Sequence, residues 1–387
     1  ISSGGDKEYA SLPEQHRFVI PNGCHWQEVR ERTENLGAAI VGAMRQIEIA
    51  NPDTLYGVLS MFSSQKWTNK AILNDSKIRD LIEHLSKRKL GNKDYPADLM
   101  GDAYEILLKK FADDSKAQAG EFYTPRSVVR LLVHILDPQP GETVYDPACG
   151  SGGMLIEAIR YMHDDSLCCG SIFGQEKNVV NAAIAKMNLF LHGASDFNVM
   201  QGDTLRDPKI LQGGNIAKFD CVIANPPFSL ENWGATEWSS DKYKRNIYGT
   251  PSDSCGDYAW IQHMICSMSS GKGRMAVVMP QGILFRGNQE AEIRKQLVES
   301  NLIEAVVTLG DKLFYGTGLS PCFLIIRRMK QAHHSGRILM IDGSQILTQK
   351  RAQNILEEND IDRLYSLYQN YSDEEDYSRI VTLQEIR

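Results

Sequence analysis

The sequence predicts an α/β protein in which a mostly parallel β-sheet carries helices on both faces and follows a helical domain. Three observations predict this fold. Short β-rich runs alternate with helix-length amphipathic stretches between residues 115 and 344, apolar residues recur at helical spacing before residue 114, and a glycine-rich turn follows the first β-rich run. A chain of 387 residues is long enough for two or three domains.

Three segments are predicted along the chain. Residues 1–114 form a mostly helical domain, because apolar residues such as Leu81 and Leu85 repeat with the period of a helix. A polar loop separates this domain from the α/β domain, residues 115–344. Residues 345–387 are predicted to form an acidic helical segment or tail, because the last 31 residues hold nine acids and three bases.

Composition excludes several classes of protein. Charged residues make up 24% and hydrophobic residues 42% of the chain, so wholesale disorder is excluded. No apolar run approaches the ~18 residues of a membrane span, and no charged-then-apolar leader opens the chain. The eight cysteines are scattered without a Cys-x-x-Cys pair, so we expect free thiols in the cytoplasm. Most of the net charge of −7 lies in the last 31 residues, so the body is nearly neutral and lacks the positive charge that holds DNA tightly.

Eight β-rich runs are predicted strands. In sequence order they are Thr143–Tyr145, Ser171–Gly174, Asn198–Gln201, Phe219–Ala224, Arg274–Met279, Leu302–Leu309, Pro321–Arg327 and Arg337–Ile341. Sheets of this kind bind ligands beyond the carboxyl ends of their strands. The loops that follow the strands are therefore the candidate site.

The loop after the first strand is rich in glycine. Asp146 ends the strand, and an apolar helix follows the residues Gly150, Ser151, Gly152 and Gly153. Glycines let a ligand approach the backbone, and the N–H groups of a helix N-terminus attract an anion. Asp146 would repel a pyrophosphate but suits a ligand with an ammonium group. The loop predicts a zwitterionic ligand rather than a dinucleotide, although a tight packing turn would also need glycine.

Acids also end the next two strands. Glu176 ends the second strand, where a carboxylate can accept both ribose hydroxyls of a nucleoside. Asp203 follows the third strand and can accept a hydrogen bond from an adenine amino group. Each acid alone is typical of a loop or a helix cap. Three successive strands that end in an acid at one edge predict a pocket for an adenosine linked to a zwitterion.

The loop after the fourth strand reads Asn225, Pro226, Pro227, Phe228. The prolines hold the chain extended and leave their carbonyls without a sheet partner. The Pro226 carbonyl and the Asn225 side-chain oxygen then form two acceptors aimed at one point, which suits an amino group with two N–H bonds. Phe228 offers a stacking face to a planar base, and a Phe packed into the core is the alternative.

These residues resemble the N6-adenine DNA methyltransferases. Asn225–Phe228 is similar to their catalytic motif, and Asp146–Gly153 is similar to their S-adenosylmethionine loop. Further stretches resemble the modification (methyltransferase) subunit of type I restriction-modification systems, namely Ala119–Arg126, Met187–Gly193, Leu284–Gly287 and Leu313–Gly318. The resemblance implies a Rossmann-like S-adenosylmethionine-dependent methyltransferase sheet and methylation of adenine in DNA.

The resemblance also implies a role for each residue of the site. Glu176 would bind the ribose of the cofactor and Asp203 its adenine. Asn225 and the Pro226 carbonyl would hold the N6 amino group of an adenine flipped out of the duplex, with Phe228 stacked on the base. The methionine part of S-adenosylmethionine would contact Glu121, Phe122, Tyr123, Thr124, Pro125, Arg126, Ser151, Gly152 and Gly153.

The resemblance implies partners as well. No target-recognition domain is recognisable after residue 344, and in type I systems a separate DNA-specificity subunit reads the sequence. We therefore expect DNA and a specificity subunit as partners, and a restriction subunit and a second copy of the chain fit the same kind of complex. Neither a metal nor a membrane is expected.

Other interpretations stay open at this point. Protein glutamine N5-methyltransferases share an Asn-Pro-Pro-aromatic loop, and a non-catalytic scaffold subunit could keep the cofactor loops. Cytosine-C5 chemistry would need a nucleophilic cysteine, but Cys322 opens an apolar run typical of a strand. His333 and His334 lie in a polar turn without further ligands for a metal. The aromatic and basic residues between Trp233 and Tyr248 form either a DNA-facing segment or an ordinary surface loop.

Overall fold

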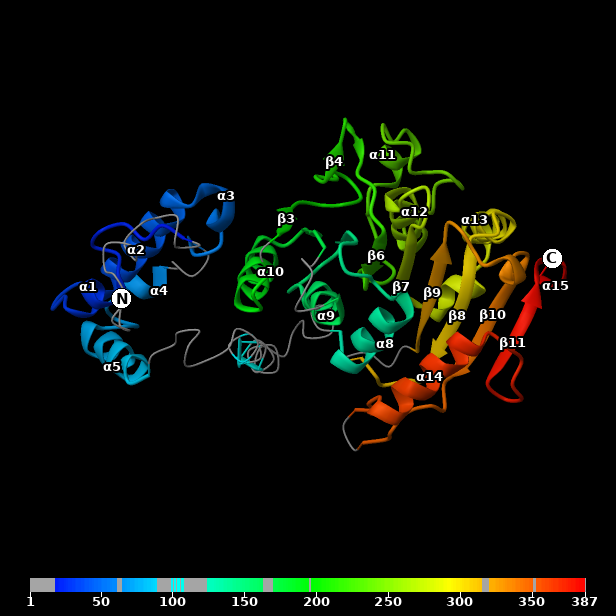
Figure 1. Ribbon diagram of the computed structural model, residues 1–387. Coiled ribbons are helices and arrows are strands. Elements are labelled where there is room, and N and C mark those ends of the chain that lie inside the picture. The colour runs from blue at the N-terminus through cyan, green and yellow to red at the C-terminus, as the bar shows by residue number, and fades with distance from the viewer. Residues whose placement is uncertain are drawn as a thin grey trace. The chain divides into compact units, whose positions relative to one another are not determined.

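The computed structural model divides the chain into two compact units, residues 1–99 and 100–387 (Figure 1). It describes residues 18–60, 65–88, 99, 101, 103, 104, 106, 107, 124–162, 170–194, 196–314, 320–350 and 353–386. The division falls fifteen residues before the predicted boundary at 114, and residues after 344 belong to the second unit. No helix in these ranges is long and apolar enough to cross a bilayer.

The regular secondary structure in the described part of the first unit is helical. Its helices are α1 (Trp26–Arg30), α2 (Leu36–Ala50), α3 (Pro52–Leu55), α4 (Gln65–Thr68) and α5 (Asp75–Ser86). Leu36 of α2 packs with Ile78 and Ile82 of α5 in a small core. Leu81 and Leu85 stay 43% and 45% exposed, because α5 buries a single stripe. The apolar spacing thus predicted the helix correctly, while these two leucines lie beside the stripe that is buried.

A nine-stranded sheet forms the centre of the second unit, in the order β11-β10-β8-β9-β7-β6-β1-β2-β3. Neighbouring strands are parallel except around β9 and at the edge strand β11. The strands are β1 (Val144–Asp146), β2 (Ile172–Glu176), β3 (Phe197–Gln201), β6 (Cys221–Ala224), β7 (Arg274–Pro280), β8 (Ile303–Leu309), β9 (Pro321–Arg327), β10 (Arg337–Gly343) and β11 (Ser378–Thr382). A separate hairpin pairs β4 (Leu211–Gln212) with β5 (Asn215–Ile216). The predicted mostly parallel sheet is confirmed, with all eight predicted strands in it.

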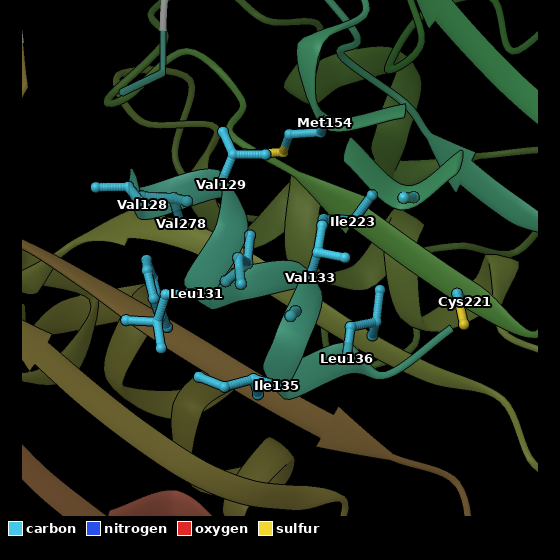
Figure 2. Packing of buried hydrophobic residues seen from close by; sticks show 14 of the residues in the cluster. Val128, Val129, Leu131, Val133, Ile135, Leu136, Met154, Cys221, Ile223 and Val278 are labelled. Atoms are coloured by element: carbon cyan, nitrogen blue, oxygen red, sulfur yellow. The ribbon is translucent and has the colours of Figure 1, made fainter. Parts of the chain in front are cut away.

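Helices cover both faces of this sheet, as predicted (Figure 1). The side chains of strand β6 show this, because they alternate between the two faces. Cys221 and Ile223 belong to the hydrophobic core on one face, which we call the first core, and Val222 and Ala224 belong to the second core, on the other face. The helices are α8 (Arg126–Leu136), α9 (Gly153–Met162), α10 (Val179–Leu191), α11 (Ala235–Ser239), α12 (Asp257–Ser267), η4 (Gln281–Leu284), α13 (Asn288–Glu299), η5 (Ala332–His334), α14 (Glu358–Asn370) and α15 (Leu383–Ile386). Figure 2 shows the first core, where α8 lays its apolar side chains on β6 and β7.

The acidic C-terminal segment is part of this unit and not a tail of its own. Helix α14 buries Ile361, Leu364 and Leu367 in the first core, and β11 pairs with β10 at the sheet edge. Glu358 at the start of α14 accepts two hydrogen bonds from the Arg130 guanidinium, at 2.7 and 2.8 Å. The apolar stripe of α14 explains the difference from the prediction, because the acids occupy only its outer face.

Candidate active site

The loops after β1, β2 and β3 are tied to one another at the carboxyl edge of the sheet. The Gly150 backbone N–H donates to Glu176 Oε2 at 2.9 Å, and the Cys149 N–H donates to the Gln175 carbonyl at 3.1 Å. The Thr204 hydroxyl, from the loop after β3, donates to the Pro147 carbonyl at 2.6 Å. The structure therefore brings the three predicted acid-bearing loops together, as the parallel order requires.

The glycine-rich turn uses left-handed backbone at two positions. Gly150 has φ of +52° and Gly152 has φ of +85°, a region that residues with a Cβ seldom adopt. Gly153 opens α9, and the side-chain amide of Asn188 on α10 donates to the Ser151 carbonyl at 3.1 Å. The Asn188 Oδ1 atom is buried and accepts no hydrogen bond within the described part of the chain. Asn188 lies in a stretch that carried the family resemblance, but it was not singled out as a site residue.

Two carboxyl groups lie close together beneath this turn. Asp146 is buried, and its Oδ1 accepts a hydrogen bond from the Ala148 N–H at 2.9 Å. Burial, together with the negative charge of Glu176, raises the pKa of Asp146 to about 8. Burial also raises the pKa of Glu176, although its oxygens accept backbone hydrogen bonds from Gly150 and Asn178. Such a pair favours a cation, because a positive charge beside the carboxyl groups stabilises their ionised form.

The side chain of Asp203 forms hydrogen bonds with the backbone of its own loop. Its Oδ1 accepts hydrogen bonds from the N–H groups of Leu205 and Arg206, each at 3.2 Å. Its Oδ2 lies 2.9 Å from the Lys177 ammonium. This is the loop role that a lone acid would have, and the adenine contact of Asp203 stays a prediction.

The loop after β6 holds its amide in one orientation. Asn225 Nδ2 donates to the Thr124 hydroxyl at 2.9 Å. Asn225 Oδ1 is buried and, among the residues that the structure describes, meets no hydrogen-bond donor. Pro226 is buried and Pro227 is exposed, while Phe228 is half-buried against the first core. The acceptor that sequence reasoning singled out is therefore available, and Phe228 is partly a packing residue.

The stretch before α8 is described from Thr124 onward. Glu121, Phe122 and Tyr123 lie outside the described residues. Pro125 is the N-cap residue of α8, and Arg126 begins that helix. Thr124, predicted to contact the cofactor, contacts the side chain of Asn225.

The aromatic and basic segment from Trp233 to Tyr248 is part core and part surface. Lys242 and Lys244 are exposed, and whether the segment faces DNA stays a prediction. Trp233 and Trp238 are buried in the second core. Arg245 is buried as well, and its guanidinium pairs with Asp241 at 2.9 Å. The same guanidinium donates to the carbonyls of Thr204 and Leu205 at 2.9 and 2.7 Å. Arg245 thus holds the loop after β3, a role that spans forty residues and leaves no local signal in the sequence.

A second ion pair, whose carboxylate is buried, supports the loop after β6. Asp257, the first residue of α12, accepts a hydrogen bond from the Ser229 N–H at 2.7 Å and binds the Arg286 guanidinium with its other oxygen. Ser229 has φ of +50°, so this hydrogen bond secures a strained turn directly after Phe228. Sequence reasoning missed Asp257, because only the fold brings it to Ser229.

The other candidate groups have structural roles. Cys322 is fully buried in β9, and burial raises the pKa of its thiol to about 12, so it does not act as a thiolate nucleophile. Cys149 is buried against Gly174. His333 and His334 lie in the short η5 turn between β9 and β10, as predicted; His333 is exposed, whereas His334 is buried with Nδ1 2.5 Å from Glu304 Oε1. In the described ranges, no three His, Cys, Asp or Glu side chains are placed to hold a metal ion.

Folds of this kind occur among S-adenosylmethionine-dependent methyltransferases. A putative class I S-adenosylmethionine-dependent methyltransferase from Listeria monocytogenes has the same fold, with a TM-score of 0.60, 15% identity and coverage of 91% of this chain and 99% of that one. A family model for N-6 DNA methylases matches residues 95–387, and the chain belongs to that family.

Relatives with known names are similar along most of the chain. The MjaVII type I restriction enzyme methylase subunit of Methanocaldococcus jannaschii is 35% identical, over 94% of this chain and 63% of that subunit. The HindI methylase subunit of Haemophilus influenzae is 31% identical, over 87% of this chain and 73% of that one. The type I restriction-modification methyltransferase subunit of Streptococcus thermophilus superposes with a TM-score of 0.85 at 27% identity, over 98% of this chain and 81% of that one. The chain thus spans less than two thirds of the MjaVII subunit.

Proposed function

We propose that the chain transfers the methyl group of S-adenosylmethionine to the N6 amino group of an adenine in DNA, as the modification subunit of a type I restriction-modification complex. One observation carries this proposal. Asn225 has its NH₂ engaged by Thr124 and its Oδ1 buried without a donor in the described ranges. A buried acceptor of this kind is costly unless a ligand supplies the missing N–H.

The N6 atom of adenine is a weak nucleophile because its lone pair is delocalised into the ring. Asn225 Oδ1 and the Pro226 carbonyl would each accept one N–H of this amino group. Acceptors on both N–H bonds draw the nitrogen toward tetrahedral geometry and return the lone pair to it. The contribution of the chain is then positioning and electrostatics, without a covalent intermediate on the protein.

Thr124 would determine which end of the Asn225 amide faces the base. Its hydroxyl accepts from Nδ2, so the amide oxygen is left for the substrate. An amide turned over by 180° would present two N–H donors to an amino group that is itself a donor. The arrangement therefore selects an amino group and repels an acceptor at the same position.

The glycine turn and the two acids fit S-adenosylmethionine. When bound, this cofactor would supply a methyl group activated on a sulfonium. Its ammonium charge matches the buried Asp146 carboxyl group, which favours a cation, and its ribose hydroxyls would donate to the half-buried Glu176. The left-handed Gly150 and Gly152 keep the turn free of side chains where the methionine part would lie.

Partner subunits would supply DNA recognition. The body of the chain is nearly neutral, since most of its net charge of −7 lies in the last 31 residues. A neutral surface neutralises few phosphates and binds DNA weakly. The MjaVII and HindI relatives are subunits of type I restriction enzymes, which is consistent with a separate specificity subunit.

Transfer of a radiolabelled methyl group tests the proposal. The chain is incubated with labelled S-adenosylmethionine and DNA, alone and with its specificity subunit, and the modified base is identified after digestion. We expect label in N6-methyladenine only with both subunits present. Label on a glutamine of a protein would contradict the proposal, and absence of transfer with every partner would indicate a scaffold subunit.

A further inference from the structure

A large apolar side chain is exposed on the loop that follows β7. Phe285 is 73% exposed, directly after η4. Strand β7 is parallel to β6, with Val277 opposite Ala224, so its carboxyl end lies at the same edge as Asn225. Phe285 also belongs to the stretch Leu284–Gly287, which the proposed function leaves without a role.

The loop that carries Phe285 is firmly held. Ile283 is buried, and its carbonyl accepts hydrogen bonds from the Tyr258 hydroxyl at 2.7 Å and from Arg294 at 3.2 Å. Arg294 donates also to the Arg286 carbonyl at 2.8 Å. The residues on both sides of Phe285 are therefore fixed, and its exposure does not come from a loose loop.

The same loop is connected to the catalytic loop through one carboxylate. Arg286 pairs with one oxygen of the buried Asp257, and the other oxygen of Asp257 accepts from the Ser229 N–H. Arg286 follows Phe285, and Ser229 follows Phe228. Each phenylalanine is thus followed directly by a residue that binds the same buried carboxylate, which links the two loops.

We propose that Phe285 is a wedge that enters the DNA base stack when the target adenine leaves it. This role rests on the proposed function, because it requires a duplex at this edge of the sheet. Flipping a base costs stacking and pairing energy, and an apolar side chain inserted at the gap recovers part of it. An exposed Phe suits this task when its loop is held firmly and is linked through Asp257 to the loop that carries Asn225.

An exposed Phe can also be an ordinary surface residue, and Met329 provides the comparison. Met329 is 72% exposed, but it follows the end of β9, where Arg327 pairs with Arg274 at the start of β7. It therefore lies at the opposite edge of the sheet. A wedge at the catalytic edge predicts an effect for Phe285 and none for Met329.

Single-turnover methyl transfer by the complex of the chain and its specificity subunit tests the wedge. Two duplexes are compared, one with the target adenine paired with thymine and one with it opposite an abasic site. For Phe285→Ala we expect a rate about tenfold lower on the paired duplex, a loss of about 1.4 kcal/mol. On the abasic duplex, which has no pair to break, the rate should stay within about twofold of the unsubstituted complex. Met329→Ala should match the unsubstituted complex on both duplexes, and Phe285→Trp should retain the rate.

Three results would overturn the wedge. Equal rates for Phe285→Ala and the unsubstituted complex on the paired duplex would make Phe285 an ordinary surface residue. An equal loss on both duplexes, or a loss of subunit association, would assign it to general docking or to a protein contact. If the unsubstituted complex methylates no DNA, the proposed function itself fails and the wedge with it.

Discussion

Two parts of the same sheet edge differ in how their polar groups are paired. The loops after β1, β2 and β3 are joined by hydrogen bonds such as Gly150 to Glu176 and Thr204 to Pro147. The loop after β6 instead keeps Asn225 Oδ1 buried without a donor in the described parts of the chain. An unsatisfied buried acceptor costs about 1–3 kcal/mol. Under the proposed function the first part, which we call the frame, would hold the cofactor, and Asn225 Oδ1 would accept a hydrogen bond from the reacting amino group.

The largest effect on the methyl-transfer rate is expected from a substitution of Asn225. Asn225→Ala removes the reserved acceptor, so we expect the methyl-transfer rate to fall at least about a hundredfold, as when one oriented group of an oxyanion hole is lost. Cofactor affinity should stay nearly unchanged, because the frame is formed by other loops. Calorimetric titration with S-adenosylmethionine and a single-turnover assay measure the two quantities. Equal loss of both would mean that Asn225 is a structural residue.

A smaller effect is expected at Thr124. Thr124→Val keeps the shape of the side chain but removes the acceptor of the Asn225 amide, so the amide is free to turn over. We expect kcat to fall about tenfold, which corresponds to about 1.4 kcal/mol, with little change in KM for DNA. Thr124→Ser restores a hydroxyl and serves as the matched control. A Ser variant as slow as the Val variant would argue against an orienting hydrogen bond.

The buried Asp146 carboxyl group of the frame predicts that both the stability of the chain and its affinity for S-adenosylmethionine depend on pH. Burial raises the pKa of Asp146 to about 8 from an ordinary 3.8, so the folded chain binds more protons than the unfolded chain between these values and loses stability as pH rises through them. A cationic ligand prefers the ionised form, so the affinity for S-adenosylmethionine should rise up to about pH 8 and then level off.

Asp146→Asn tests both effects. At pH 8 the variant should bind S-adenosylmethionine about fivefold more weakly, since one carboxylate beside the cation is gone. Its Tm should exceed that of the unsubstituted chain by more at pH 8 than at pH 5, as scanning calorimetry can measure. A pH-independent affinity in the unsubstituted chain would contradict the role of this acid as a cation partner.

The sequence predicted best those features that depend on residues adjacent in the chain. The strands that end at Asp146, Glu176 and Ala224 could be predicted, because β-rich runs and their glycine and proline boundaries are local signals. Sequence reasoning left the segment from Trp233 to Tyr248 open, and this segment is mixed: Trp233, Trp238 and Arg245 are buried, whereas Lys242 and Lys244 are exposed. It also treated residues after 344 as a separate segment, because strand pairing between β10 and β11 has no signature in either strand alone.

The sequence by itself determined the α/β class, the eight predicted strands of the sheet and the place of the Asn-Pro-Pro-Phe loop after one of them. These follow from hydrophobic periodicity and from motifs whose residues are adjacent. Only the tertiary structure decided which polar atoms remain available. Arg245 and Asp257 reach their partners across forty and twenty-eight residues, and Thr124 meets Asn225 across one hundred and one. Whether a buried acceptor is satisfied depends on such long-range contacts, and for that reason the sequence alone could not show that Asn225 Oδ1 meets no donor among the described residues.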